Sequence, residues 1–299
     1  MKKITLIALM LFTALGYAQG IELNGTISAE DNQIKNLQDP TEAQDAVTLS
    51  VLLEKISALQ DQISALQATT GSGTVTDIDG NSYAFLTYGD QVWTVENAEM
   101  VTYRDGTPIP EVSDPTQWNS LTTGAWGYYN NDPTKPRLYN WYAVMGIHDT
   151  DPNTPNKEFA PQGWHVATDA EWTTLEEYLI ANGHNYDGTT TGDKIAKAMS
   201  STTGWFSKTY GCLDPSCTGA VGNDQSTNNS SGFNAFPEGY RGSINGVSFS
   251  GEGFFAFFWS STEDFADNAR YCSLSYSSSN LYRGSSYKRQ GSSVRFVRD

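Results

Sequence analysis

The sequence predicts an α+β fold, because one strong helix-forming segment stands among many short, aromatic-rich runs of strand character. The helix signals gather at residues 169–182, whereas strand-like runs recur between residues 83 and 297. The 299 residues include 27 glycines and 11 prolines, and 12% are aromatic. This composition favours a loop-rich protein with an aromatic core over a disordered chain.

Residues 1–18 have the pattern of a cleaved secretory signal peptide. Lys2 and Lys3 precede an apolar run over residues 4–15, and a small-x-small cleavage site ends at Ala18. The apolar run is shorter than the roughly 20 residues that span a bilayer, and no later run reaches that length. We therefore expect an exported protein, extracellular or on the cell surface, with no membrane span.

Residues 19–46 are polar and are expected to be extended, and residues 47–68 carry a heptad pattern. The apolar positions of the heptads are Leu49, Leu52, Ile56, Leu59, Ile63 and Leu66. So narrow a strip needs a partner, which favours a self-associating coiled-coil stalk over a helix packed on its own domain. Isoleucine at a with leucine at d favours a dimer. Because residues 37–46 resemble the segment before trimeric stalks in phage tail-fibre-like and bacterial surface proteins, we prefer a trimer.

Residues 69–74 are a Gly/Ser/Thr linker, and the globular domain is expected over residues 75–299. A turn at residues 77–81 precedes strands at 83–88 and 91–95, and further strands are predicted at 253–259, 271–276 and 294–297. The Asp and Asn oxygens of the turn would also suit calcium. No glutamate completes an EF-hand loop there, so we expect a hairpin turn.

The predicted helix at residues 169–182 has signals at both ends. Thr168 is a candidate N-cap with Glu171 as its capping-box partner, and Gly183 supplies the stop. The buried stripe is expected to be Trp172, Leu175 and Leu179. A second, short helix is predicted at residues 193–199.

The charge balance and the motifs exclude several function classes. With 18 basic against 34 acidic residues the net charge is −16, which argues against nucleic acid. No nucleophile elbow or phosphate loop occurs, and His165 is expected to be structural. Cys212 and Cys217 would close a small disulfide loop, and their spacing lacks the second ligand pair of a zinc site. We expect no enzyme activity, no metal and no cofactor, although paired carboxylates leave a glycan-processing enzyme as the alternative.

The eight tryptophans are either core residues or platforms on which sugars stack. At least five lie in apolar strand-like or helical contexts and are expected in the core. Trp118 and Trp205 have polar neighbours and are expected to be the more exposed ones.

Residues 273–287 are the most unusual stretch, with seven serines and three tyrosines among fifteen residues. Tyrosine supplies rigid contact area and serine supplies adaptable hydrogen bonds, so this composition is typical of binding surfaces. The alternative is a solvated loop. Apolar residues within the stretch, and a core-like run at 294–297, favour a surface segment pinned at both ends.

Seven segments of the globular domain resemble motifs of the Fibrobacter succinogenes major paralogous domain. They are QVWTVEN at residues 91–97, LYNW at 138–141, PQGWHVATDAEW at 161–172, GFNA at 232–235, PEGYR at 237–241, WSST at 259–262 and SVRFVRD at 293–299. The resemblance implies a C-type-lectin-like fold related to the formylglycine-generating-enzyme branch.

The chain departs from the family pattern at two cysteine positions, where it has Ala160 and Phe296. Their joint absence implies that the two cysteines pair in relatives, and Phe296 is expected to pack where the bridge would lie. No segment matches the catalytic cysteine pair of the formylglycine-generating branch. The Trp-Asn-Asp calcium motif of animal lectins is also missing, since Trp259 is followed by serines. Neither activity is therefore carried over.

In some family members the stretch between the WSST and SVRFVRD segments is the variable repeat of a diversity-generating retroelement, and residues 263–287 resemble such a repeat. The resemblance implies that the ligand contacts are Glu263, Asp264, Asn268, Arg270, Ser273, Ser275, Ser277, Ser279, Asn280, Tyr282, Arg283 and Tyr287. The function expected is that of an adhesin or receptor-like protein that binds a protein or glycan. A purely structural surface component is the further alternative.

Overall fold

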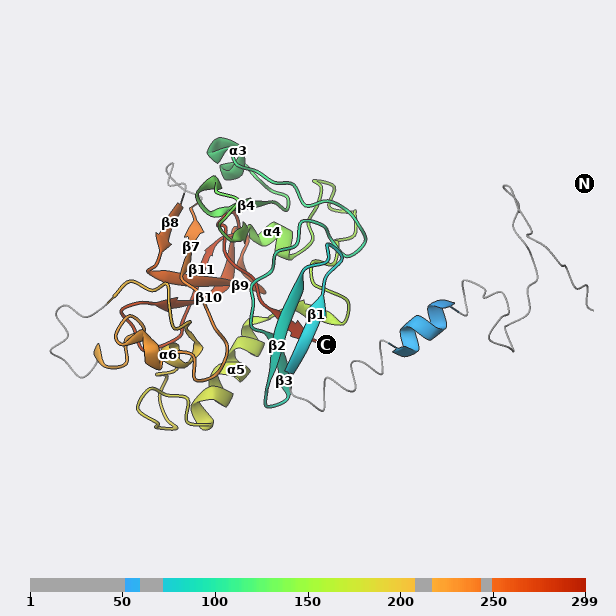
Figure 1. The fold of residues 1–299 in the computed structure, drawn as a ribbon. Coiled ribbons are helices and arrows are strands. Elements are labelled where there is room, and N and C mark those ends of the chain that lie inside the picture. Colours follow the sequence, from blue (N-terminus) through green and yellow to red (C-terminus); the bar gives the residue numbers. More distant parts are fainter. Residues whose placement is uncertain (1–51, 60–71, 208–216, 243–248) are drawn as a thin grey trace, which may run out of the picture. The chain divides into compact units, whose positions relative to one another are not determined.

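The computed structural model describes residues 52–59, 72–207, 217–242 and 249–299 (Figure 1). Residues 52–59 are helical, as the heptad pattern predicts, and expose Leu52, Ile56 and Leu59 by 47%, 42% and 57%. The expected signal peptide, the extended segment 19–46, the remainder of the stalk and most of the linker lie outside the described residues. No helix in the described ranges has both the length and the apolar character needed to cross a bilayer.

The described strands of the globular part form two larger sheets and a two-stranded ribbon. The first sheet has the order β1-β2-β3-β12-β6, with bounds Ser72–Thr76, Ser82–Tyr88, Gln91–Thr94, Phe296–Arg298 and Trp164–Val166. The second has the order β11-β10-β9-β7-β8, with bounds Tyr282–Tyr287, Asn268–Ser275, Phe255–Phe265, Glu238–Arg241 and Phe249–Glu252. The ribbon pairs β4 (Trp126–Tyr128) with β5 (Arg137–Tyr139). The β1 strand begins at Ser72, inside the predicted linker.

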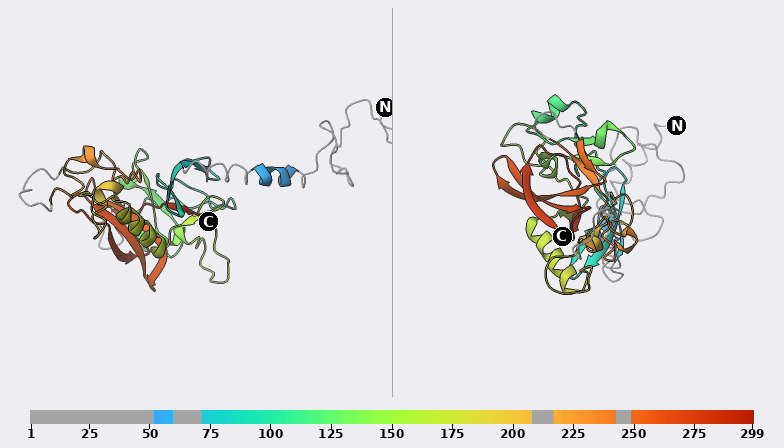
Figure 2. Two further views of the ribbon diagram at one scale, coloured as in Figure 1. Left: turned by 90° about the horizontal axis from the view of Figure 1, so that it is seen from below. Right: turned by 90° about the vertical axis from the view of Figure 1, so that its left-hand side faces the viewer.

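The helices are few and mostly short, which confirms the α+β class. They are α3 (Pro115–Asn119), α4 (Trp141–Val144), α5 (Asp169–Ala181) and α6 (Ala196–Met199), with 3-10 turns at Tyr129–Asn131 and Gln225–Thr227. The α6 helix begins three residues later than predicted. Both views in Figure 2 show α5 beside the C-terminal strands, and it packs on β2 as well as on β9 and β10.

The α5 helix has the ends that its sequence predicts. The Thr168 side chain accepts from the Glu171 amide, and the Glu171 carboxylate accepts from the Thr168 amide at 2.7 Å, so the capping box is complete. Gly183 follows the C-cap with φ +76°. Trp172, Leu175 and Leu179 are fully buried, which stabilises the fold by roughly 1.5–3 kcal/mol each.

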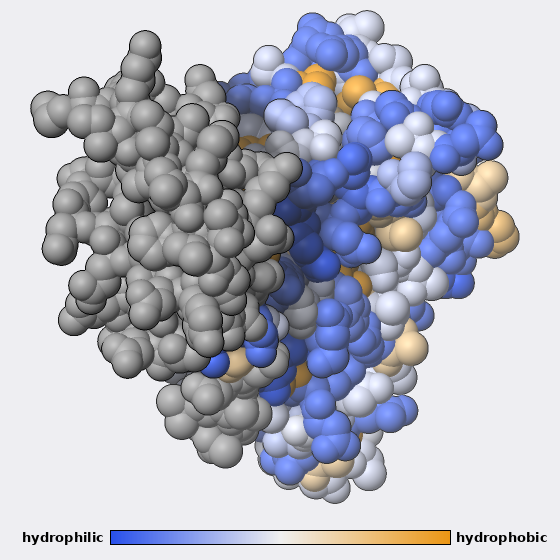
Figure 3. Space-filling view, turned by 90° about the vertical axis from the view of Figure 1, so that its right-hand side faces the viewer, coloured by the Kyte–Doolittle hydropathy of each residue, from blue (hydrophilic) through white to orange (hydrophobic). Residues whose placement is uncertain are grey.

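Aromatic residues fill the space between α5 and the sheets. The ring centroids of Trp93 and Trp172 lie 4.7 Å apart, and Phe233 and Phe258 pack beside these rings. Around Tyr139 and Trp259 a second group of buried residues fills the other part of the core. The described side chains on the face seen in Figure 3 are mostly hydrophilic, with isolated hydrophobic ones, as the acidic composition leads one to expect.

The expectation that Trp118 and Trp205 are exposed is wrong, since they are 0% and 5% exposed. The polar surroundings of each ring satisfy the indole N–H inside the fold. Trp118 donates to the Arg289 carbonyl at 2.6 Å and lies under the Arg241 guanidinium, whereas Trp205 donates to a serine hydroxyl at 3.1 Å. Polar neighbours in the sequence therefore did not indicate exposure, because each indole N–H finds its acceptor inside the fold.

Two smaller predictions also concern this domain. The turn at residues 77–81 is present, with Gly80 at φ +87° and the Asp77 carboxylate accepting from the Asn81 amide at 2.9 Å. Ala160 and Phe296 lie in one core cluster, where the Phe296 ring contacts Tyr83 and Phe159. Cys217 is a free cysteine in the structure, and Cys212, with which it could pair, lies outside the described residues.

Candidate ligand-binding surface

The β9, β10 and β11 strands, which carry most of the predicted contacts, form an antiparallel array with two different faces. Directly opposed residues in such an array lie on the same face. Cys272 opposes Arg283 and packs toward α5, whereas Ser273 opposes Tyr282 on the other face. The predicted contacts are thus divided between two faces of the sheet.

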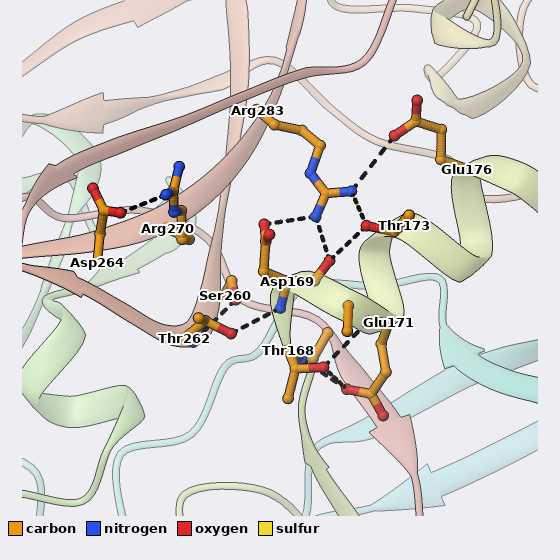
Figure 4. Close-up of polar contacts among 12 residues, drawn as sticks. Thr168, Asp169, Glu171, Thr173, Glu176, Ser260, Thr262, Asp264, Arg270 and Arg283 are labelled. Carbon is orange, nitrogen blue, oxygen red and sulfur yellow. Dashed lines mark hydrogen bonds and ion pairs between the residues drawn. The ribbon is translucent and has the colours of Figure 1, made fainter.

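On the α5 side, Arg283 holds β11 against the helix (Figure 4). Its guanidinium contacts the Thr173 hydroxyl at 2.5 Å, the Asp169 carboxylate at 2.6 Å and the Glu176 carboxylate at 3.6 Å. The Arg283 side chain is only 22% exposed. Its geometry is that of a positioning residue, with its donors turned to the helix.

At the β9–β10 turn the structure gathers several predicted contacts around an exposed aromatic pair. Asn268 is opposed by Phe265 on one side and by Tyr287 on the other, and these rings are 70% and 41% exposed. Arg270, two residues along, pairs with Asp264 at 2.5 Å. Sequence reasoning missed Phe265; its one signal was an aromatic residue inside the polar run EDFADN.

The other face carries a row of aromatic rings in mutual contact across four strands. The row consists of Tyr240, Phe257, Tyr271 and Tyr282, with successive ring centroids 5.0, 5.1 and 6.2 Å apart. Tyr282 is 56% exposed, and the other three rings are half-buried. Gly284 leaves room for the row, because a Cβ there would lie 2.9 Å from both the Tyr271 hydroxyl and the Tyr282 ring. We call these four residues the aromatic row.

Sequence reasoning found only Tyr282 of this row. Phe257 and Tyr271 lie in the predicted strands 253–259 and 271–276, and Tyr240 lies in the PEGYR segment, but none of the three was named as a ligand contact. Residues 254–259, FFAFFW, are apolar throughout and gave no signal of the alternation in the structure, where Ala256 and Phe258 are 1% exposed and Phe257 between them is half-buried.

The serine-rich loop between β10 and β11 is pinned at both ends, as predicted. At the β10 end the Tyr276 carbonyl accepts from the Gly222 amide at 2.7 Å, and at the β11 end the Leu281 amide donates to the Asp193 carboxylate at 2.9 Å. Within this loop Ser277 and Asn280 are exposed.

The twelve predicted contacts therefore differ in accessibility. Six are exposed: Glu263, Arg270, Ser277, Asn280, Tyr282 and Tyr287. Five are half-buried: Asp264, Asn268, Ser275, Ser279 and Arg283. Ser273 is buried, at 6% exposure, and so is not available to a ligand in this conformation. Glu263 forms an ion pair with Lys288, whose ammonium lies over the Trp141 ring.

His165 has the structural surroundings that its sequence predicts. Its ring nitrogens lie 2.7 Å from carboxylates of Glu171 and Asp299, and these contacts, with the Glu171 hydrogen bond first, raise the pKa of the imidazole to about 9. Across the described ranges no three His, Cys, Asp or Glu side chains form a group that could hold a metal ion.

An α+β domain with a C-terminal antiparallel sheet as its candidate binding surface is the class of protein that these features define. The chain belongs to the Fibrobacter succinogenes major domain family, whose family model matches residues 86–298. Comparison with curated proteins and with solved structures gave no match.

Proposed function

We propose that the protein is an exported or cell-surface binding protein that recognises a protein or glycan, without covalent chemistry, through its C-terminal sheet. The aromatic row is the observation that carries the proposal. Four rings in contact offer a continuous apolar strip with tyrosine hydroxyls along it, which suits both sugar rings and protein side chains.

The contacts behind the sheet support this function. The Arg283 contacts join β11 to α5, and the loop before β11 is held by α6 and the Asp193 carboxylate. A surface that is already ordered loses less conformational entropy when a ligand binds. The exposed residues at the β9–β10 turn would extend the contact area at the edge of the sheet.

The proposal includes the C-type-lectin-like fold, the variable repeat and the trimeric coiled-coil stalk that the sequence resemblances imply. The exposed Leu52, Ile56 and Leu59 side chains on the described helix support self-association. Several heads on one stalk would bind a multivalent surface with avidity beyond that of one site.

Array binding of the full exported chain tests the proposal. The labelled protein is applied to glycan arrays and to bacterial surface-protein arrays, and captured ligands are retested with Tyr282→Ala and Tyr287→Ala. Ile78→Ala is the matched control, because Ile78 is 52% exposed and lies in the turn at residues 77–81. We expect the tyrosine variants to bind at least about tenfold more weakly and the control to bind normally.

Three outcomes would contradict the proposal. Binding by the tyrosine variants as tight as that of the wild type would show that the ligand does not bind at this surface. Release of a product from a polysaccharide would favour the glycan-processing alternative. Absence of any ligand on either array would favour a structural surface component.

A further inference from the structure

A cavity of about 430 Å³ lies beside the first sheet and contains none of the twelve predicted contacts. Its volume is in the range of small-molecule sites. Three segments far apart in the sequence converge on it. The described lining residues are Asn81, Ser82, Tyr83, Val95, Glu96, Asn97, Glu99, Asn234, Phe236, Glu238 and Arg295.

Protein acceptors engage most of the donors of Arg295, the basic residue that lines this cavity. Arg295 is 1% exposed and donates from Nε to the Asn97 side chain at 2.6 Å. Its other nitrogens donate to the carbonyls of residues 94, 233 and 234. The Asn97 amide donates onward to Glu238 Oε2 at 2.5 Å. Four of the five N–H groups of the guanidinium thus donate to protein acceptors, so its charge is largely satisfied without an anionic ligand.

The acceptors of the cavity, in contrast, are only partly used. Both hydrogen bonds to Glu238, from Asn97 and from Ser293, end on Oε2, which leaves Oε1 without a described partner. The side-chain Nδ2 of Asn81 donates twice, to the Asp77 carboxylate and to the Glu99 carbonyl, and the side-chain Oδ1 accepts from no described group. The cavity thus presents free acceptors and calls for a ligand with donors.

The charges of the described lining also favour a cationic ligand. Glu96, Glu99 and Glu238 line the cavity against one guanidinium, and Glu99 is paired with Arg137 outside the lining. Burial raises the pKa of Glu238 to about 7, against the hydrogen bonds from Ser293 and Asn97 and the charge of Arg295. Phe236, 40% exposed, adds an aromatic ring to the wall.

We infer that this cavity binds a ligand carrying a protonated primary amine, with Glu238 as its carboxylate partner and Phe236 as an apolar or cation–π contact. A free polyamine and the lysine side chain of a protein share this chemistry. The described lining contains no residue of the aromatic row, so variants at Glu238 and at Tyr282 test the two sites separately.

Calorimetric titration of the full chain at pH 8 tests the inference. The probes are butylammonium, its neutral isostere butanol, spermidine and Nα-acetyl-lysinamide, the last two separating the polyamine source from the lysine source. We expect butylammonium to bind at least tenfold more tightly than butanol, and Glu238→Gln to weaken it at least tenfold. Glu177→Gln is the matched control, because Glu177 is exposed on α5 and lines no part of the cavity.

The pH dependence gives a second readout. Butylammonium stays protonated between pH 5.5 and pH 8, whereas Glu238 becomes neutral at the lower pH, so wild-type affinity should fall about tenfold and that of Glu238→Gln should not. The charged groups that face Glu238 are Arg295 and Glu99. Equal affinity for butanol, equal loss in the two variants, or no heat with any amine would overturn the inference. A thermal melt confirms that Glu238→Gln is folded.

Discussion

Replacement of Arg283 by methionine tests whether β11 is held to α5 by the contacts in Figure 4. Methionine keeps the apolar stem and removes the guanidinium, which leaves the Asp169 and Glu176 carboxylates, 34% and 20% exposed, without their cation. Hydrogen bonds to charged groups contribute about 1.5–3 kcal/mol when buried and less than 1 kcal/mol when exposed. For this half-buried cluster we expect a loss of about 2 kcal/mol.

Urea unfolding followed by circular dichroism measures this loss at pH 7. In a domain of this size the loss corresponds to a fall in Tm of about 4–8 °C. Lys135→Met is the control, because its ion pair with Glu252 has both side chains exposed, at 38% and 44%, and we expect a change below about 0.5 kcal/mol. Equal effects of the two substitutions would refute the reasoning.

Three further predictions concern stability. Trp118→Ala should cost about 3–5 kcal/mol in urea unfolding, since the ring is fully buried; a cost below 1 kcal/mol would mean that the ring is exposed after all. Thr168→Ala should cost about 1 kcal/mol in the same assay by removing the N-cap, and an unchanged midpoint would contradict the capping box. His165 has a folded pKa of about 9, above its usual 6.5, so its stabilisation is complete below about pH 6.5 and disappears as the pH rises through 9. Thermal melts from pH 6 to 10 should show this loss in the wild type and not in His165→Gln.

Local signals predicted the elements of the fold well where the chain itself supplies the partners. The α5 helix begins and ends near the predicted residues because Thr168, Glu171 and Gly183 act within a few positions of the helix ends. The strands at residues 83–88 and 91–95 were also predicted from local features, namely their own composition and the turn before them. The order β3-β12-β6, which places the last strand in the middle of a sheet begun by the first, depends on contacts that no local pattern contains.

The candidate site was predicted less completely, because a side chain's use depends on the face on which it lies. Tyr282 and Arg283 are adjacent in the sequence, and both are polar enough to lie on a surface. In the structure Arg283 contacts α5, whereas Tyr282 is exposed to solvent. Composition identified the segment but not the alternation, and it did not include Phe257 and Tyr271, which only the pairing of strands brings beside Tyr282.

The buried positions of β10, and Leu281 just before β11, also limit how this segment can change over generations. Ala269, Cys272, Leu274 and Leu281 are at most 3% exposed, so a mutational process that acted evenly over residues 263–287 would ruin many of its own products. A lineage that diversifies this segment and keeps a folded protein must therefore conserve these buried positions and vary the exposed ones. Sequences of close relatives would then vary at the exposed positions and keep small or apolar residues at positions 269, 272, 274 and 281.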